Sequence, residues 1–403
     1  MHLFLNGLAA SAGGGLTYLR NVLPHLSSRE GVQVSAAVNP GLRRELSALP
    51  RVALPEINFR AGTVGRFWQE QTLLPAAIRR SGAAVLISVG NFALRKSPVP
   101  QILLSRNALY TSTDFLRDLR QRRAYGLWLD TRIKGSLARR SIQWADHTVA
   151  PTEAFAQELR QWAGREVVAI HHGFDREAFF RDQTALAADI QQKLDREKDA
   201  VRLLYVSHYN YYRNFDTLFR ALPRIREQLG GRKLKLFLTC RLRSEDNPGS
   251  YRAEAASALV AQLGIGDSVV ELGAVPYSLL HHLYRACSMY VTPAYAESFA
   301  HPLVEAMASG LPIVASDLAV HREICGDAAI YFQRFSAEEL AARVYEIAAS
   351  DGLAKQLSDR GHERARAFSW DKHVDQLLDL AANLLATIDP ARRPETRPRD
   401  FSG

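Results

Sequence analysis

Short apolar runs alternate with longer segments of helical periodicity along the whole 403-residue chain. The runs have roughly four to eight residues, the length typical of buried strands, whereas the segments between them repeat apolar residues every three or four positions. This alternation predicts parallel sheets with helices on both faces. The predicted strands are 2–7, 32–38, 83–90, 100–106 and 147–152, then 202–208, 234–240, 268–275, 288–293, 312–316 and 329–332.

The predicted strands form two series, separated by residues 171–199, where strand signals disappear and charge rises. We place the domain boundary near residues 173–175. The pattern predicts an α/β fold of two Rossmann-like domains, 1–173 and 174–369, whose parallel sheets face each other across a cleft. A last amphipathic segment, 370–388, is expected to join the N-terminal domain as a helix, and the Pro- and Arg-rich tail 389–403 is expected to be disordered.

The positive charge of the chain is concentrated in one stretch. The net charge is +9, and residues 117–140 carry eight Arg or Lys against two Asp, with Trp128 among them. Such a stretch suits an anionic partner such as a nucleotide phosphate, a lipid surface or nucleic acid, although a solvated helix face is the alternative. Because no nucleic-acid-binding module accompanies the stretch, we expect no nucleic-acid partner.

The remaining composition indicates a cytoplasmic protein. No run of eighteen apolar residues exists, so no membrane-spanning helix is predicted. The N-terminus has the pattern of a strand and a glycine loop and lacks the basic start of a signal peptide. The cysteines Cys240, Cys287 and Cys325 have no paired or metal-ligand spacing, which favours free, buried thiols. If residues 117–140 bind lipid, the protein is peripheral on the inner face of the membrane.

Two loops that follow predicted strands contain phosphate-binding residue types. Gly13, Gly14 and Gly15 follow the first strand and could bring backbone N–H groups close to a phosphate, although their spacing matches neither the dinucleotide fingerprint nor a P-loop. A tight turn without ligand is the alternative. His208 and Arg213 follow the first strand of the second series. Arginine is unfavourable at a helix start unless an anion binds there, and its planar fork suits a diphosphate.

A third loop contains "AESFAHPLVEAMASGLPIVAS", with Glu297 and Glu305 on either side of Pro302. Pro302 fits the first position of a short helix, whose free N–H groups at Leu303 and Val304 would form an anion site. A carboxylate near a helix start can be merely a dipole partner, but this explains only Glu305. Since carboxylates accept hydrogen bonds from sugar hydroxyls, the loop favours a phosphorylated, polyhydroxylated ligand.

This third stretch resembles the signature of the retaining family 4 glycosyltransferases (glycosyl transferases group 1), which have the GT-B fold. The residues that carry the likeness are Glu297, Phe299, Pro302, Glu305, Ala306, Gly310, Pro312 and the "VAS" that follows. Other family motifs occur in the same order, so the resemblance covers nearly the whole chain. They are the triple glycine, "WADHTVAPTEAF" at 144–155, "IHHGFD" at 170–175, "RNFDTL" at 213–218 and "HREICGDAAIYF" at 321–332.

The resemblance implies a role for each motif residue. Glu305 would hold the ribose hydroxyls of a donor nucleotide, and Glu297 would position the donor sugar without acting as a nucleophile. Arg213 and His208 would stabilise the departing diphosphate. The further donor contacts that it implies are Gly14 and Gly15 from the opposite domain, Ser298, Phe299, Ala300, His301, Leu303, Val304 and, near the nucleobase, Val275. Where relatives have a sugar-contacting histidine, Arg106 or Asn107 would substitute.

The chain departs from the family pattern at "ESFAHP". Ser298 and Ala300 stand where glycines are usual, and Ala300 restricts the loop if its φ must be positive. His301 is either a sugar contact or a residue of the helix cap. His208 replaces a usual arginine and carries a less dependable charge near pH 7.

The implied reaction transfers a hexose or deoxyhexose from a UDP- or GDP-linked sugar to a hydroxyl of a glycan or lipid-linked acceptor, in polysaccharide or glycolipid assembly. No metal and no cofactor besides the nucleotide-sugar co-substrate is expected. A non-catalytic GT-B subunit that binds nucleotide sugars is one alternative. A dinucleotide-dependent oxidoreductase is another, but it requires a Gly-x-Gly-x-x-Gly turn that the sequence does not place after the first strand.

Overall fold

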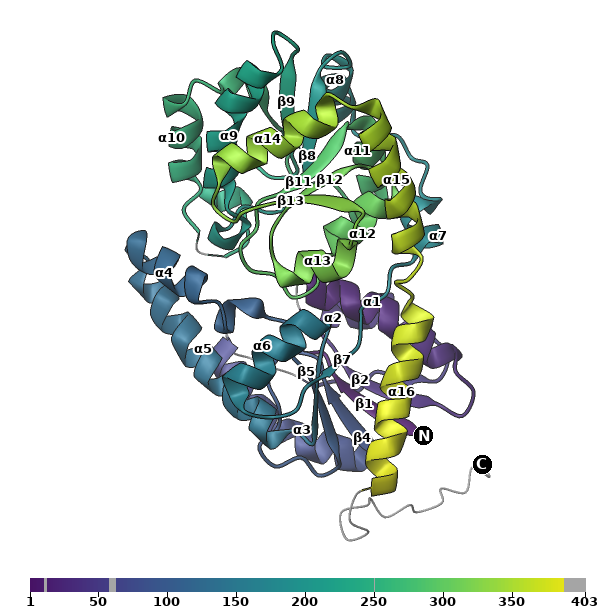
Figure 1. Ribbon diagram of the computed structural model, residues 1–403. Coiled ribbons are helices and arrows are strands. Elements are labelled where there is room, and N and C mark those ends of the chain that lie inside the picture. Colours follow the sequence, from purple (N-terminus) through teal and green to yellow (C-terminus); the bar gives the residue numbers. More distant parts are fainter. Residues whose placement is uncertain (11–12, 58–62, 250, 388–403) are drawn as a thin grey trace. The chain divides into compact units, whose positions relative to one another are not determined.

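The computed structural model describes residues 1–10, 13–57, 63–249 and 251–387 (Figure 1). The chain divides into two compact units. The first contains Met1–Thr111, Asp130–Gly173 and the segment that starts at Trp370, and the second contains Ser112–Leu129 and Phe174–Ser369. The tail predicted to be disordered, 389–403, lies outside the described residues.

The first unit is built on a seven-stranded sheet of order β3-β2-β1-β4-β5-β6-β7, in which all pairs are parallel. The five strands predicted in this half are all present. Strands β3 and β7 were not predicted, since two residues are too few to give an apolar run. The strands are β1 (His2–Asn6), β2 (Gln33–Ala37), β3 (Val52–Ala53), β4 (Val85–Ser88), β5 (Gln101–Leu104), β6 (His147–Ala150) and β7 (Val168–Ala169).

Helices cover both faces of this first sheet (Figure 1). Successive side chains of a strand point to opposite faces. Leu3 and Leu5 of β1 therefore enter one core with α1 and α16, and Phe4 enters another with α3. The helices of this unit are α1 (Gly13–Ser28), α2 (Pro40–Glu45), α3 (Thr63–Ser81), η1 (Ala108–Tyr110), α6 (Glu153–Ala163) and α16 (Trp370–Thr387), together with most of α5 (Tyr125–Trp144).

The second unit is built on a six-stranded parallel sheet of order β10-β9-β8-β11-β12-β13. All six strands were predicted from their apolar runs. The strands are β8 (Val201–Tyr205), β9 (Leu234–Leu238), β10 (Val269–Glu271), β11 (Met289–Thr292), β12 (Ile313–Ser316) and β13 (Ala329–Phe332).

The helices of the second unit lie before, between and after these strands along the chain. They are α4 (Thr113–Gln121), α7 (Arg176–Arg181), α8 (Ala188–Asp195), η2 (Tyr211–Arg213), α9 (Phe215–Gln228), η3 (Ser244–Asp246), α10 (Glu254–Gln262), η4 (Gly266–Ser268), η5 (Tyr277–Leu279), α11 (Leu280–Ala286), α12 (His301–Ala308), α13 (Ala319–Cys325), α14 (Ala337–Ala348) and α15 (Asp351–Ala365). Among the described residues, no helix is long and apolar enough to cross a membrane.

The second sheet reverses its direction of winding between β8 and β11. From β8 the chain runs outward through β9 and β10, and it then returns to pair β11 with the other side of β8. Open α/β sheets bind ligands outside the carboxyl ends of their strands at such a reversal. The loops that follow β8 and β11 are therefore the expected ligand-binding loops of this unit.

One segment differs from the predicted domain division. The sequence analysis placed residues 1–173 together, but Ser112–Leu129 packs with the second unit. Ion pairs explain the difference, because Asp114 of α4 pairs with Arg334 at 2.9 Å and Arg122 pairs with Asp216 at 2.9 Å. Such pairs leave no periodic signal in the sequence.

The three cysteines are free and buried, as predicted. Burial raises the pKa of the Cys240 and Cys287 thiols to about 12. Both thiols are therefore protonated at neutral pH and are poor nucleophiles.

The junction between Gly173 and Trp370 in the first unit predicts an intolerant position. A Cβ atom on Gly173 would lie 2.1 Å from the Trp370 backbone nitrogen, so Gly173→Ala should lower the free energy of unfolding of this unit by about 3 kcal/mol. Gly126→Ala is the control, because a Cβ there meets no atom within 4 Å and alanine favours the helix. Thermal unfolding should show a lower melting temperature for Gly173→Ala and no decrease for Gly126→Ala. An unchanged melting temperature for Gly173→Ala would contradict the packing.

Candidate functional site

The loops after β8 and β11 are joined by two hydrogen bonds. Asn214 Nδ2 donates to the Pro293 carbonyl at 3.0 Å, and the Tyr295 amide donates to the Tyr212 carbonyl at 3.0 Å. Asn214 adopts φ 55° and ψ 46°, a left-handed conformation that asparagine tolerates better than most residues. The two loops therefore form one structure at the reversal of the sheet.

Arg213 and Glu297 form an ion pair at the centre of this structure, and their side chains are 19% and 9% exposed. The backbone of Arg213 is fixed on both sides, because its amide donates to Asn210 Oδ1 at 3.1 Å and its carbonyl accepts from Tyr205 Oη at 2.7 Å. The sequence analysis assigned both charged residues to the site but did not predict that they pair. Removing one partner would leave the other charge largely buried and uncompensated.

His208 lies in the same loop as Arg213, and its side chain is exposed. Burial of part of the ring and the nearby Arg213 charge both lower the pKa of His208 below its ordinary value. At pH 7 the ring is therefore predominantly neutral, so Arg213 supplies the permanent positive charge of this loop.

Glu305 is 4% exposed and lies on α12, the helix that follows the Glu297 loop. Burial raises the pKa of Glu305 to about 7, and the hydrogen bond from Tyr284 partly opposes this increase. Tyr284 Oη donates to Glu305 Oε2 at 2.8 Å from α11. Tyr284 was not predicted as a site residue, because in the sequence it is one of several large residues in a short helical segment.

The start of α12 differs in two ways from the prediction. The helix begins at His301, so Pro302 is its second residue and not its first. The Leu303 amide donates to the Ala300 carbonyl at 3.0 Å, so the prediction that this N–H is free to bind an anion is wrong. The sequence could not show this bond because it depends on the conformation of Ala300. After the helix ends at Ala308, Gly310 adopts φ 72°, a left-handed conformation that favours glycine.

Ala300 adopts φ 64° and ψ 63°, a left-handed conformation. The sequence analysis identified this position as one where the family usually has glycine. For an alanine this conformation costs roughly 1–2 kcal/mol. The chain therefore keeps the loop shape that glycine would allow, at the cost of local strain.

The other predicted residues of the second unit lie in two places. Phe299 is buried, with its ring 4.7 Å from that of His301 and 5.6 Å from that of Phe368, so its side chain belongs to the packing of the loop. Ser298 and His301 are half-buried and Val304 is fully buried. Val275 is half-buried in the loop that follows β10.

In the first unit, Arg106 supports the glycine loop. Its guanidinium donates to the Gly14 carbonyl at 3.3 Å and to the Val89 carbonyl at 2.7 Å, and it lies 4.7 Å from the centre of the Tyr18 ring. Asn107 Oδ1 caps η1 by accepting from the Leu109 amide at 3.1 Å. The side chains of Arg106 and Asn107 thus both have structural partners within the first unit. The prediction that one of the two contacts the donor sugar remains a prediction.

The glycine loop itself leaves space beside its backbone. A Cβ atom on Gly14 would meet no atom within 4 Å, whereas one on Gly15 would lie 3.2 Å from Ala10 Cβ. A side chain at position 15 would therefore crowd Ala10, whereas the space beside Gly14 is open to a ligand.

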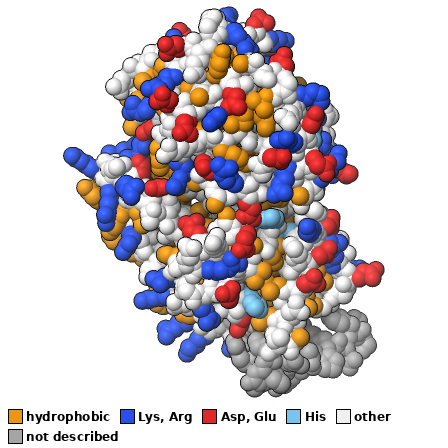
Figure 2. Space-filling view, viewed as in Figure 1, with side chains coloured by type: hydrophobic (Ala, Val, Ile, Leu, Met, Phe, Trp, Pro, Cys, Tyr) orange, Lys and Arg blue, Asp and Glu red, His pale blue; other side chains and the backbone are white. Residues whose placement is uncertain are grey.

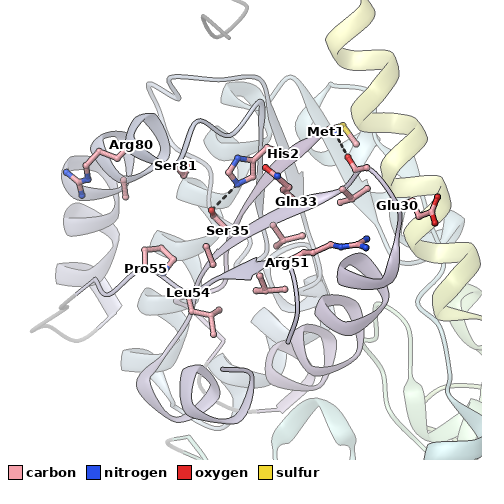
Figure 3. Close-up of a pocket in the computed structure, with 16 residues that line it drawn as sticks. Met1, His2, Glu30, Gln33, Ser35, Arg51, Leu54, Pro55, Arg80 and Ser81 are labelled. Atoms are coloured by element: carbon pink, nitrogen blue, oxygen red, sulfur yellow. Dashed lines mark hydrogen bonds between the residues drawn. The ribbon is translucent and has the colours of Figure 1, made fainter. Parts of the chain in front are cut away.

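A cavity of about 1370 Å³ lies elsewhere in the first unit, at the amino ends of the strands. His2 Nε2 and Ser35 Oγ lie 3.0 Å apart among its lining residues and form a hydrogen bond, drawn as a dashed line in Figure 3. Arg51 and Arg80 also line the cavity. None of the predicted site residues lines this cavity. Because parallel α/β sheets bind ligands at the carboxyl ends of strands, we do not assign the function to it.

Solved structures of known proteins share the architecture of two parallel α/β units described above. Sucrose-phosphate synthase from Thermosynechococcus elongatus matches 96% of this chain and 100% of its own, with a TM-score of 0.75 and 19% identity. Anabaena HepE, solved in complex with UDP-glucose, matches 95% of this chain and 100% of its own, with a TM-score of 0.70 and 16% identity. These likenesses show that the two parallel α/β units have the GT-B fold.

Two family models match successive parts of the sequence. Glycosyltransferase Family 4 matches residues 12–178, and Glycosyl transferases group 1 matches residues 187–364. The chain therefore belongs to the family 4, group 1 glycosyltransferases. A D-inositol 3-phosphate glycosyltransferase from Streptomyces bingchenggensis is 26% identical over 255 residues, 60% of this chain. The chain spans about half, 53%, of the length of that relative.

The raised pKa of Glu305 predicts a pH-dependent stability. A carboxyl whose pKa is about 7 when folded and 4.5 when unfolded contributes its full stability below pH 4.5 and loses it as the pH rises through 7. Glu305→Gln should therefore stabilise the protein at pH 8, by up to about 3 kcal/mol, and have little effect at pH 4.5. Melting temperatures at both pH values test this.

Glu227→Gln, on the exposed face of α9, is the matched control because it makes the same chemical change at the surface. Equal responses of the two variants at pH 8 would show that burial of Glu305 does not control the effect.

Proposed function

We propose that this protein is a retaining glycosyltransferase that moves a hexose or deoxyhexose from a UDP- or GDP-linked sugar to a hydroxyl of a glycan or glycolipid. The observation that carries the proposal is the Arg213–Glu297 pair at the reversal of the second sheet, together with the buried Glu305 on α12, the helix that follows the Glu297 loop. One cation and two carboxylates suit a ligand that has a diphosphate between two polyhydroxylated groups, with the cation on the diphosphate and one carboxylate on each of the other groups.

In the proposed reaction, the bond between the anomeric carbon and the diphosphate oxygen breaks as the acceptor oxygen attacks from the same face. The leaving phosphate oxygen takes the proton of the acceptor hydroxyl, so atoms and charges balance. Arg213 stabilises the charge that develops on the diphosphate. Glu297 positions the donor sugar, and Glu305 accepts hydrogen bonds from the ribose. We propose that the transfer needs no metal, with Arg213 providing the positive charge.

The proposed nucleobase site is the loop after β10, where Gly273 adopts φ 78° and Val275 is half-buried. Anabaena HepE was solved in complex with UDP-glucose, which supports UDP rather than GDP as the nucleotide of the proposed donor. Gly14 is the proposed contact of the first unit with the diphosphate, because the space beside it is open.

A ligand panel tests the donor. Thermal shifts with UDP, GDP, ADP, TDP and NAD should show stabilisation by UDP or GDP, about 2.7 kcal/mol at a hundredfold excess over Kd. Glu305→Gln should weaken that binding about tenfold, because it removes a charged acceptor of the ribose hydroxyls, and Glu227→Gln should not. Stabilisation by NAD alone would overturn the transferase proposal. Binding of a nucleotide sugar without hydrolysis or transfer would favour a non-catalytic subunit.

We propose further that α5 holds the protein on an anionic membrane that carries a lipid-linked acceptor. Three apolar side chains four residues apart are exposed on this helix, namely Tyr125 at 62%, Leu129 at 54% and Ile133 at 57%. Exposed arginines lie at Arg132, Arg139 and Arg140. Basic and apolar side chains meet in the region of α4 and α5 in Figure 2. An amphipathic surface of this composition suits the interface of an anionic bilayer.

Sedimentation with phosphatidylglycerol vesicles tests the membrane proposal. The protein should co-sediment at low salt and be released as salt rises, because the attraction is largely electrostatic. Arg132→Glu with Arg139→Glu should reduce the bound fraction at least tenfold, since each residue contributes about 1 kcal/mol. Arg220→Glu with Arg224→Glu, on the exposed face of α9, is the matched control. Equal binding by both double variants would contradict the proposal.

A further inference from the structure

Helix α4 has an unexpected partner. In the chain it lies between β5 and α5, next to strands of the first sheet, yet it packs in the second unit. The ring of Phe115 on α4 lies 6.2 Å from the ring of Tyr212, edge to face, and Tyr212 directly precedes Arg213. The helix therefore contacts the loop that contains the site.

A continuous network of hydrogen bonds joins α4 to the loop after β11 and to the first turn of α9, the helix that follows Arg213. Tyr295 Oη donates to Asp118 Oδ2 at 2.7 Å, and Arg122 Nε donates to Asp118 Oδ1 at 2.7 Å. Arg122 Nη2 in turn donates to Asp216 Oδ2 at 2.9 Å. Both carboxylate oxygens of Asp118 are thus engaged, one by each neighbour.

The two ends of the network lie beside the two charged residues of the site. Tyr295 is two residues before Glu297, and Asp216 is three residues after Arg213. Tyr295 is 3% exposed, and the side chain of Asp118 is 16% exposed. Burial and the Asp118 carboxylate raise the pKa of Tyr295 well above its ordinary value, so its hydroxyl stays protonated and donates. Bonds at this burial fix geometry better than exposed pairs do.

Of the two carboxylates of the site, the network reaches only Glu297. Glu305 is held separately by Tyr284 of α11, whereas Glu297 lies in the loop that Tyr295 anchors. We propose that Asp118 is a positioning residue of the donor site, which through Tyr295 fixes the loop carrying Glu297 against Arg213. The inference rests on the proposed function, in which Glu297 meets the sugar and Glu305 meets the ribose. Loss of the Asp118 contact should therefore affect the sugar end of the ligand more than the nucleotide end.

The test compares a nucleotide sugar with its own diphosphate. Titration calorimetry with UDP and UDP-glucose, and with GDP and GDP-mannose, gives the two Kd values for each variant. Asp118→Asn and Tyr295→Phe should each raise the Kd of the nucleotide sugar about tenfold and change the Kd of the diphosphate less than twofold. The double variant should be no worse than the more damaging single one, because both substitutions act on the same bond: Tyr295→Phe removes it, and Asp118→Asn replaces its charged acceptor with a neutral amide.

Asp114→Asn is the matched control. It makes the same change on the same helix, but Asp114 pairs with Arg117 at 3.3 Å and with Arg334 at 2.9 Å, on the loop after β13. It should leave both Kd values within twofold of the wild type. If Asp118→Asn does not fold, Tyr295→Phe still tests the positioning role, because it leaves the ion pair of Asp118 with Arg122 in place.

Four outcomes would overturn the inference. In the first, Asp118→Asn and Asp114→Asn have equal effects. In the second, the diphosphate is weakened as much as the nucleotide sugar, which indicates a general structural role. In the third, the wild type binds no nucleotide sugar, and the proposed function then fails as well. Normal binding of the nucleotide sugar by the wild type and by both Asp118→Asn and Tyr295→Phe would reject the positioning role alone.

Discussion

The pairing of β11 beside β8 is the constraint on which the candidate site depends. The two strands are separated by two other strands in sequence, but they lie side by side in the sheet and both point their carboxyl ends to one edge. That arrangement brings the Arg213 loop against the Glu297 loop, and the bond from Asn214 to the Pro293 carbonyl fixes them there. Without the pairing of β8 with β11, the largely buried Arg213 would lack the carboxylate of Glu297, and an unpaired buried charge is strongly destabilising.

The sequence predicted those features that depend on local residue patterns. Eleven strands were recognised from apolar runs. Arg213 was identified because arginine is unfavourable at a helix start, and Glu297 and Glu305 because they lie on either side of Pro302 at the start of a short helix. The pairing of Arg213 with Glu297, the bond of Tyr284 to Glu305 and the packing of α4 were not predicted. Each of these depends on which strands and helices become neighbours, which no periodicity records.

Ala300 shows how a local rule and the fold can conflict. Left-handed backbone favours glycine, yet an alanine adopts φ 64° at the turn from the Glu297 loop into α12. The Leu303 amide bonds to the Ala300 carbonyl, and Phe299 is buried against Phe368, so residues on both sides hold the turn. Strained residues persist where the surrounding structure determines their conformation, and they are common at functional sites. The strain at Ala300 thus agrees with the assignment of this loop to ligand binding.

The charges of the site constrain how the proposed ligand could enter. Arg213 already has a carboxylate partner, so a diphosphate that binds it competes with Glu297. A Glu297 displaced from Arg213 would be a buried charge without a partner unless hydroxyl groups replaced the guanidinium, because unpaired buried carboxylates are costly. A donor sugar supplies such hydroxyls and a free diphosphate does not. Under the proposed function, the exchange of partners itself favours the complete nucleotide sugar over its diphosphate, and the anchoring of Tyr295 by Asp118 keeps Glu297 within reach of both.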